Sequence, residues 1–187
     1  MKNFGKFSFV LLLPLLAIGF QGTTNAQFSD AYDFRVAIEN NDLGEARSRI
    51  FGGANVNGRH DGLPYLMIAL SNRYYDMARL LLDNGAYVNM DAIPNLETPL
   101  MLMATNGDET GLKMLLDFNP DLNATNKSGQ TALMKAAQSR KTAVAKLLVE
   151  AGADVFQTDY VGRDALMYAK EARARNIIRL LEEAGVN

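Results

Sequence analysis

The sequence predicts an all-α protein built as a solenoid of repeated helix pairs. The dipeptide Leu-Met occurs at residues 66–67, 100–101, 133–134 and 166–167, with spacings of 34, 33 and 33 residues. Leu-Leu pairs at 81–82, 115–116, 147–148 and 180–181 recur at about the same interval. Two independent marks that keep one register over four units indicate internal repetition, and in such an array each unit buries its apolar face against the next.

The first 26 residues have the layout of a cleaved secretory signal peptide. Two lysines precede an apolar run at residues 7–20, and the small residues Thr24 and Ala26 occupy positions −3 and −1 of a cut after Ala26. An uncleaved anchor is the alternative, but a span takes about 20 apolar residues, and Pro14 interrupts this run. We expect the mature chain, residues 27–187, to lie outside the cytoplasm without inserting into the membrane.

The unit at residues 126–158 shows the expected elements most regularly. Thr131 is a good N-cap for a first helix, because its hydroxyl can accept from an exposed N–H of the first turn. Leu133 and Ala136 follow at helical spacing, and the small alanine lets a neighbouring helix approach closely. An apolar stripe around Leu148 predicts the second helix, and Gly152 supplies its left-handed end. A polar tip follows, and no segment alternates long enough to predict a genuine sheet.

We divide the mature chain into about five such units. They are residues 29–58, 59–92, 93–125, 126–158 and 159–187, with approximate boundaries. The first and last units carry charged residues among their apolar positions. This is expected of capping units, whose outer face meets solvent.

Two short motifs recur within the units. Thr-Pro-Leu stands at 98–100 and Thr-Ala-Leu at 131–133, while Gly-Ala-Asp-Val at 152–155 and Gly-Ala-Tyr-Val-Asn at 85–89 close two second helices. They closely resemble the T-P-L-H-x-A signature and the G-A-D-V-N closure of the ankyrin repeat. The resemblance extends from about residue 29 to 187. It implies an α-solenoid of antiparallel helix pairs joined by hairpin-like fingers, which binds a partner protein through the fingers and the concave helix face.

The units depart from this family at the signature histidine. Methionine replaces it four times, as Met67, Met101, Met134 and Met167. Methionine cannot bond to the threonine hydroxyl as that histidine does, so we expect each unit to exchange a hydrogen bond of about 0.5–1.5 kcal/mol for apolar filling. Pro64 and Asp164 replace the signature threonine in two units, and only Asp164 can still cap a helix.

A thioether column outside the cytoplasm has an alternative interpretation, namely Cu(I) binding or reaction with oxidants. Copper requires several sulfurs around one ion, whereas stacked helices lie about 8–10 Å apart. One methionine per unit therefore favours core filling, and we expect no cofactor.

Composition argues against catalysis and against nucleic-acid binding. The chain has no cysteine and one histidine, which excludes disulfides and a zinc site of several Cys and His ligands. His60, between Arg59 and Asp61 at a predicted fingertip, is the only conventional general base, and no motif ties a serine or carboxylate to it. The mature chain carries 17 basic and 21 acidic residues, a net charge of −4, which gives no electrostatic basis for binding nucleic acid.

The last two units are more basic than the first three. Their lysines and arginines include Lys135, Arg140, Lys141, Lys146, Lys170, Arg173, Arg175 and Arg179. This end either faces an acidic partner or anionic lipid headgroups, or belongs to a mixed-charge surface with the glutamates nearby.

Positions that the repeat does not dictate are the candidates for partner binding. They lie on the fingers and on the exposed ends of the first helices, where ligands of the family usually lie. The set is Arg59, His60, Asn72, Asn95, Glu97, Asn106, Lys127, Gln130, Gln138, Tyr160 and Arg163. Aromatic and arginine side chains are the usual anchors of interfaces, so Tyr160, Arg163 and Arg59 are preferred.

These features together predict a monomeric, non-catalytic scaffold that binds another protein in the bacterial envelope, most simply in the periplasm. The signal peptide has no lipid-attachment cysteine, and the mature chain consists only of repeats. The alternative is a secreted effector that acts on a host protein, or an inhibitor of an envelope enzyme. An enzyme, or a metal-binding or oxidant-handling protein, is the third class.

Overall fold

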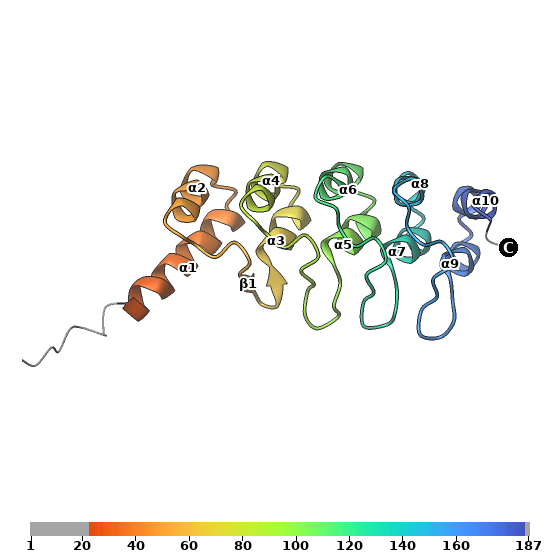
Figure 1. The fold of residues 1–187 in the computed structure, drawn as a ribbon, viewed down its shortest axis with the longest axis horizontal. Coiled ribbons are helices and arrows are strands. Elements are labelled where there is room, and N and C mark those ends of the chain that lie inside the picture. The colour runs from red at the N-terminus through yellow and green to blue at the C-terminus, as the bar shows by residue number, and fades with distance from the viewer. Residues whose placement is uncertain (1–22, 186–187) are drawn as a thin grey trace, which may run out of the picture.

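The computed structural model describes residues 23–185, which form ten helices and one short hairpin (Figure 1). The helices are α1 (Thr23–Glu39), α2 (Leu43–Phe51), α3 (Tyr65–Ser71), α4 (Tyr75–Asp83), α5 (Pro99–Asn106), α6 (Glu109–Leu116), α7 (Ala132–Gln138), α8 (Thr142–Glu150), α9 (Ala165–Glu171) and α10 (Arg175–Glu183). The hairpin consists of β1 (Arg59–His60) and β2 (Leu63–Pro64). The predicted signal peptide lies outside the described residues except for residues 23–26, which begin α1.

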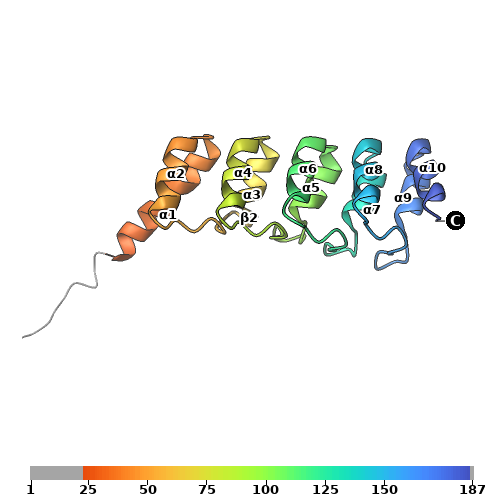
Figure 2. The ribbon, with the colours of Figure 1, turned by 45° about the horizontal axis from the view of Figure 1, so that its top comes forward.

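The helices stack in two layers that run the length of the molecule (Figures 1 and 2). Each odd-numbered helix packs against the even-numbered helix that follows it. Helix α3 also contacts α1 and α5, and α7 contacts α5 and α9, while α8 contacts α6 and α10 in the second layer. One hydrophobic cluster extends from Phe34 in α1 to Leu181 in α10. The structure therefore confirms the predicted all-α solenoid, in which apolar faces are buried between neighbours.

The starts of the first helices follow the predicted capping residues. The hydroxyl of Thr131 accepts from the N–H of Met134 at 3.3 Å, and the carboxylate of Asp164 accepts from the N–H of Met167 at 2.7 Å. Both predicted caps are confirmed. Pro64 precedes α3 without any side-chain cap. Its helix is held instead by the complete burial of its apolar residues.

The methionine positions fill the core in three of the four units. Met67, Met101 and Met134 are buried, whereas Met167 is 47% exposed in α9, the last of the first helices within the described residues. The sulfur of Met134 also accepts from the N–H of Thr131 at 3.5 Å. This unit therefore keeps a weak hydrogen bond that the comparison with the histidine signature did not predict.

The fingers are tied to one another by backbone hydrogen bonds. The N–H groups of Ile93, Lys127 and Tyr160 donate to carbonyls of the preceding finger at 3.0, 2.9 and 3.3 Å. Gly129 allows the last of these contacts, because a Cβ there would lie 2.7 Å from the Tyr160 ring and the backbone has a φ of +80°. Only the first finger forms a two-residue antiparallel ladder within the described residues, consistent with the absence of a predicted sheet.

A column of asparagines joins the loops that follow the second helices. The side-chain oxygens of Asn57, Asn89 and Asn123 accept from backbone N–H groups of the next unit at 2.7, 2.9 and 2.9 Å. Phe156 occupies the equivalent position in the last described loop of this kind and is exposed. We call Asn57, Asn89 and Asn123 the asparagine column. Each member links one unit to the following one.

Candidate functional site

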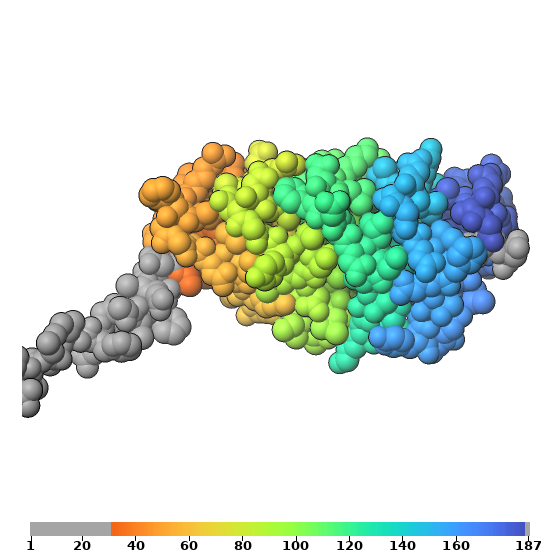
Figure 3. All heavy atoms as spheres, viewed as in Figure 1, coloured from red at the N-terminus to blue at the C-terminus, as the bar shows by residue number. Residues whose placement is uncertain are grey.

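The fingers and the first helices together form one continuous surface, which we call the finger face. It comprises residues 59–64, 92–97, 126–130 and 159–163 with helices α3, α5, α7 and α9. The fingers project along one edge of the stack (Figure 1), and successive units meet without a break in the space-filling view (Figure 3). Every predicted partner-binding residue lies on this surface or at its margin.

A hollow of about 220 Å³ opens on the finger face between the first two fingers and helices α3 and α5. We call it the finger hollow. Its lining is mainly apolar, from Leu63, Met67, Ala92, Ile93, Pro94 and Leu102, with Ser71, Asn95 and Glu97 as polar members. Apolar concavities with a few polar groups are typical of binding sites. The finger hollow can accept an apolar side chain of a partner.

Large apolar side chains stand exposed beside this hollow and along the fingers. Ile93 is 54% and Leu96 is 41% exposed, and Tyr160 is 74% exposed at the last fingertip with Val161 beside it. Exposed apolar residues that gather on one surface indicate an interaction site. Tyr160 was among the predicted anchors, whereas Ile93 and Leu96 were not among the selected residues.

The signal that points to Ile93 lies in the alignment of the units. Counted back from the Leu-Met pairs, Ile93 aligns with Asn126 and Asp159, but the second finger has one residue more. The bond from the Ala92 N–H to the Glu97 carbonyl matches those from Asn126 to Gln130 and from Asp159 to Arg163. Ile93 therefore takes the place of Lys127 and Tyr160, which are also exposed.

Arg59 and His60 belong to the first finger. The guanidinium of Arg59 bonds to the backbone carbonyl of Asp91, to its Oδ1 at 3.1 Å and to the carbonyl of Gly62 at 3.3 Å. The Nε2 atom of His60 lies 3.5 Å from a carboxylate oxygen of Asp61 and 3.9 Å from one of Glu39. Arg59 therefore joins two fingers, and the His60 ring stays half-exposed between two acids.

Two further predicted residues bridge adjacent units. Glu97 accepts from the ammonium of Lys135 in α7 at 2.7 Å, and both side chains are largely shielded from water. The amide of Gln130 donates to the hydroxyl of Tyr168 in α9 at 2.8 Å. Both contacts run from one finger to the first helix of a later unit. They stabilise the finger face and also place these polar groups within it.

Asp159, Arg163 and Tyr168 form a polar network in the last finger. The Tyr168 hydroxyl donates to Asp159 Oδ2 at 2.7 Å and accepts from Arg163 at 2.6 Å. The Arg163 guanidinium donates to the same carboxylate at 3.0 Å and lies 4.5 Å from the centre of the Tyr168 ring. Burial raises the pKa of Asp159, but hydrogen bonds from the Arg163 and Val161 N–H groups, the Tyr168 hydroxyl and the guanidinium outweigh it and hold this pKa at about 2.

The remaining predicted residues differ in how much of their polar surface is free. Asn95, Asn106, Lys127, Gln138 and Tyr160 are exposed. The Asn72 amide donates to the carbonyl of Ile68 at 2.9 Å. Of the three preferred anchors, Tyr160 is the most exposed, at 74%, whereas the two arginines are partly buried and bond within the chain.

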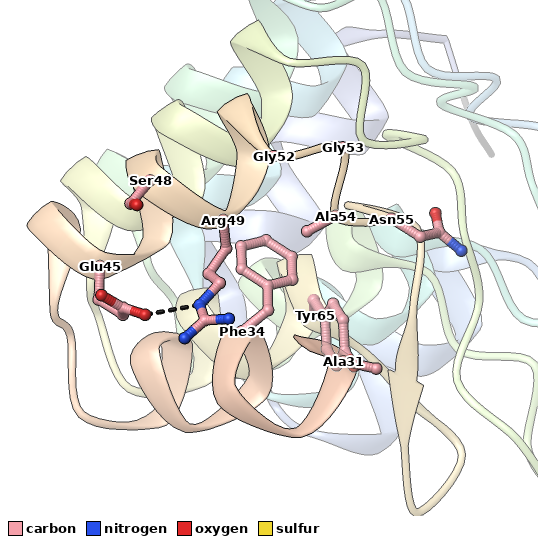
Figure 4. Close-up of a pocket in the computed structure, with 10 residues that line it drawn as sticks. All are labelled: Ala31, Phe34, Glu45, Ser48, Arg49, Gly52, Gly53, Ala54, Asn55 and Tyr65. Carbon is pink, nitrogen blue, oxygen red and sulfur yellow. Dashed lines mark hydrogen bonds and ion pairs between the residues drawn. The ribbon is translucent and has the colours of Figure 1, made fainter. Parts of the chain in front are cut away.

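A second hollow, of about 640 Å³, lies at the N-terminal end between α1, α2 and the loop that follows α2 (Figure 4). The rings of Phe34 and Tyr65 meet edge to face there, 5.6 Å apart. The guanidinium of Arg49 bonds to Glu45 at 2.6 Å and to Asp33 at 3.1 Å. The charge of Arg49 is thus compensated within the chain. None of the predicted partner-binding residues lines this second hollow.

The described residues contain neither a cluster of three or more His, Cys, Asp or Glu side chains suited to a metal ion nor a helix with the length and hydropathy of a membrane span. The finger face carries the finger hollow and several exposed apolar groups, while other exposed apolar side chains of residues 23–185, among them Phe51, Tyr87 and Phe156, lie outside it.

Comparison with known proteins matches this architecture to one family. The family model for ankyrin repeats in three copies matches residues 66–159 and again 100–187. The ankyrin repeat and KH domain-containing protein mask of Drosophila melanogaster is 38% identical over 82 residues, which cover 43% of this chain and 2% of that protein. The putative ankyrin repeat protein FPV031 of Fowlpox virus (strain NVSL) is 32% identical over 104 residues, which cover 54% of this chain and 30% of that protein.

The BRCA1-associated RING domain protein 1 of Caenorhabditis elegans is 27% identical over 95 residues, covering 51% of this chain and 14% of that protein. The chain thus spans less than a third of the length of each of these relatives. The repeat register, the stacked helix pairs and the matching family model lead to one conclusion. The chain belongs to the ankyrin repeat family.

Proposed function

We propose that this chain is a non-catalytic scaffold that binds a partner protein through the finger face. Ankyrin repeats in general mediate protein–protein interaction. The observation that carries the proposal is the apolar finger hollow with Ile93 and Leu96 exposed beside it. A partner that inserts one apolar side chain there, and covers Tyr160 at the other end, would bury most of the exposed apolar surface of the fingers.

The energetic basis of this binding is the removal of apolar surface from water. Each large side chain that becomes fully buried contributes about 1.5–3 kcal/mol. A few such anchors surrounded by polar contacts carry most of the affinity of an interface. Asn95 and Lys127 are exposed on the same fingers as the apolar residues or next to them and would provide this polar surround, while Gln138 lies at the margin, at the end of α7.

We place the scaffold in a bacterial envelope, most simply in the periplasm, as a monomer. The layout of residues 1–26 as a signal peptide supports export. A secreted effector that acts on a host protein, or an inhibitor of an envelope enzyme, is the second candidate. It rests on the same signal peptide and the same finger face.

The test is an affinity capture with three forms of the purified protein. The first is the wild type, the second carries Ile93→Ser and Tyr160→Ala, and the third carries Tyr87→Ala. All three positions are exposed, so these variants are expected to fold. The control Tyr87 lies in the loop that follows α4, outside the finger face.

We expect a protein retained from envelope extract by the wild type and by the Tyr87 variant, and absent with the double variant. Retention of the same protein by all three forms would contradict binding through the finger face. Size-exclusion chromatography of the wild type, with a single species at the mass of one chain, tests the monomer. Fractionation of the natural host, with the protein in the periplasm or the medium, tests the proposed location.

A further inference from the structure

The turns between paired helices lie at the edge of the molecule opposite the fingers, because each pair is antiparallel (Figure 2). Between the α7–α8 turn and the α9–α10 turn there is an open hollow of about 600 Å³. Its lining residues are Arg140, Thr142, Arg173, Ala174, Arg175 and Asn176. We call it the basic hollow. It shares no residue with the finger hollow.

The arginines of the basic hollow carry uncompensated charge. Arg140, Arg173 and Arg175 are exposed, and within residues 23–185 none of them lies within 4.0 Å of a carboxylate. No acidic residue lines the hollow. Glu171, two residues before Arg173, pairs with Arg163 at 3.7 Å, and Glu150, at the far end of α8, lies 3.7 Å from Lys146.

The turns of the other units differ from these two in their charged residues. Helices α2 and α6 begin with Asp42 and Asp108, whose carboxylates cap the helix, whereas α4, α8 and α10 have no side-chain cap. Arg73 in the α3–α4 turn matches Arg140 and Arg173, but Asn41 and Gly107 occupy this position in the turns on either side of it. Arg140 and Arg173 therefore stand in consecutive turns, and the hollow has no anionic side chain to offset them.

We propose that the basic hollow docks an acidic segment of a protein, that is, a run of aspartate and glutamate side chains. Guanidinium groups pair with carboxylates in a planar, two-point geometry, and the hollow offers three of them from two turns. The full chain has a net charge of −2, so it exerts no general attraction on acidic ligands. Attraction must come from this site alone and acts only over about 10 Å at 0.1 M salt.

The shape of the site favours a peptide over a membrane surface. Binding to lipid requires apolar side chains that enter the acyl boundary together with the basic residues. The basic hollow has only Ala174 and the methyl group of Thr142 as apolar parts, and Ala174 is buried. A recess between two turns can enclose carboxylate side chains, whereas a flat headgroup layer would leave it unfilled.

The experiment measures fluorescence anisotropy of a labelled oligoglutamate peptide titrated with the purified protein at low salt. One variant carries Arg140→Ala, Arg173→Ala and Arg175→Ala. The matched control carries Arg47→Ala, Lys113→Ala and Lys146→Ala, which remove the same charge from exposed positions on other helix surfaces. Circular dichroism verifies that both variants keep the helical content of the wild type.

We expect the first variant to bind the peptide about fivefold to a hundredfold more weakly than the wild type, because it loses three exposed ion pairs that each contribute about two- to fivefold. The control should bind within about twofold of the wild type, and the finger-face variant of Ile93 and Tyr160 should be unaffected. Equal weakening in both charge variants, or no binding to the wild type, would overturn the proposal. Arginine-dependent sedimentation with phosphatidylglycerol vesicles, without peptide binding, would also overturn it in favour of a membrane contact.

Discussion

Replacement of Tyr168 by phenylalanine tests how much the hydrogen bonds between the last finger and helix α9 contribute to the stability of the protein. The substitution keeps the buried ring and its contact with the Arg163 guanidinium, and removes one oxygen atom. That oxygen donates to Asp159 at 2.7 Å and accepts from Gln130 at 2.8 Å and from Arg163 at 2.6 Å. The perturbation is therefore confined to the polar network.

The magnitude follows from the environment of Asp159. A hydrogen bond to a charged group contributes about 1.5–3 kcal/mol, whereas a neutral one contributes about 0.5–1.5 kcal/mol. Gln130 is partly exposed and can bond to water instead, and Arg163 keeps its direct contact with Asp159. The side chain of Asp159 is only 1% exposed, so water cannot replace the lost donor. We expect Tyr168→Phe to lower the free energy of unfolding by about 2–3 kcal/mol.

Tyr75→Phe is the matched control, because it also removes one phenolic oxygen. The Tyr75 hydroxyl makes a single hydrogen bond, to Asp108 at 2.8 Å, and its side chain is partly exposed. Its loss should cost about 1.5 kcal/mol, the lower end of the range for a bond to a carboxylate, because water can reach the partly exposed Tyr75. Urea unfolding followed by circular dichroism measures both variants. If Tyr168→Phe destabilised the protein no more than Tyr75→Phe, the reasoning about the buried network would be refuted.

Three further predictions follow. The folded-state pKa of Asp159, about 2, lies below its ordinary value of 3.8, so its stabilisation is present above pH 3.8 and lost as the pH falls toward 2. It amounts to at most about 2 kcal/mol, and acid titration of the unfolding free energy should show a smaller loss in Tyr168→Phe than in the wild type. Asn89→Ala removes the 2.9 Å bond to the Asp121 N–H and should lower the free energy of unfolding by about 1 kcal/mol. Phe156→Ala, at the same repeat position, should lower it by less than about 0.5 kcal/mol. Equal losses in urea unfolding would contradict a linking role for the asparagine column. Met134→Ala should lower the free energy of unfolding by about 2–5 kcal/mol and Met167→Ala by less than about 1 kcal/mol, since Met134 is buried and Met167 is 47% exposed. Similar losses of stability in thermal unfolding would count against core filling as the role of these methionines.

The helices could be predicted from the sequence because local rules determine them. Thr131 and Asp164 cap first helices as their side chains allow, and Gly152, at a φ of +95°, follows the end of a second helix. Leu133 and Ala136 are buried where helical spacing places them. Each of these features depends on residues within one unit, and repetition of the unit determines the stacking.

Contacts between units were harder to predict, because they depend on residues about one repeat apart. Arg59 and Arg163 were preferred as partner anchors from their residue type, yet both guanidiniums bond within the chain. The sequence does not show that the carbonyl of Asp91 and the hydroxyl of Tyr168 lie within reach. The role of Gln130 depends on Tyr168 for the same reason.

The asparagine column had a visible signal that residue-type reasoning overlooked. Asn57, Asn89 and Asn123 recur at one position of the repeat, and Phe156 ends the series. The finger hollow left a weaker signal, namely one additional residue in the second finger together with the apolar residues Ile93 and Leu96. A concave surface arises from the packing of two fingers on two helices, so its existence required the three-dimensional structure.

The most direct test of the finger face as the binding surface is site-specific photocrosslinking in the natural host. A benzoylphenylalanine placed at Leu96, beside the finger hollow, is compared with one at Tyr87, in the loop that follows α4. Both positions are exposed and both original side chains are large and apolar in part. We predict a crosslinked partner with the probe at position 96 and none with the probe at position 87. A crosslink at position 87 alone would show that the partner binds elsewhere on the molecule.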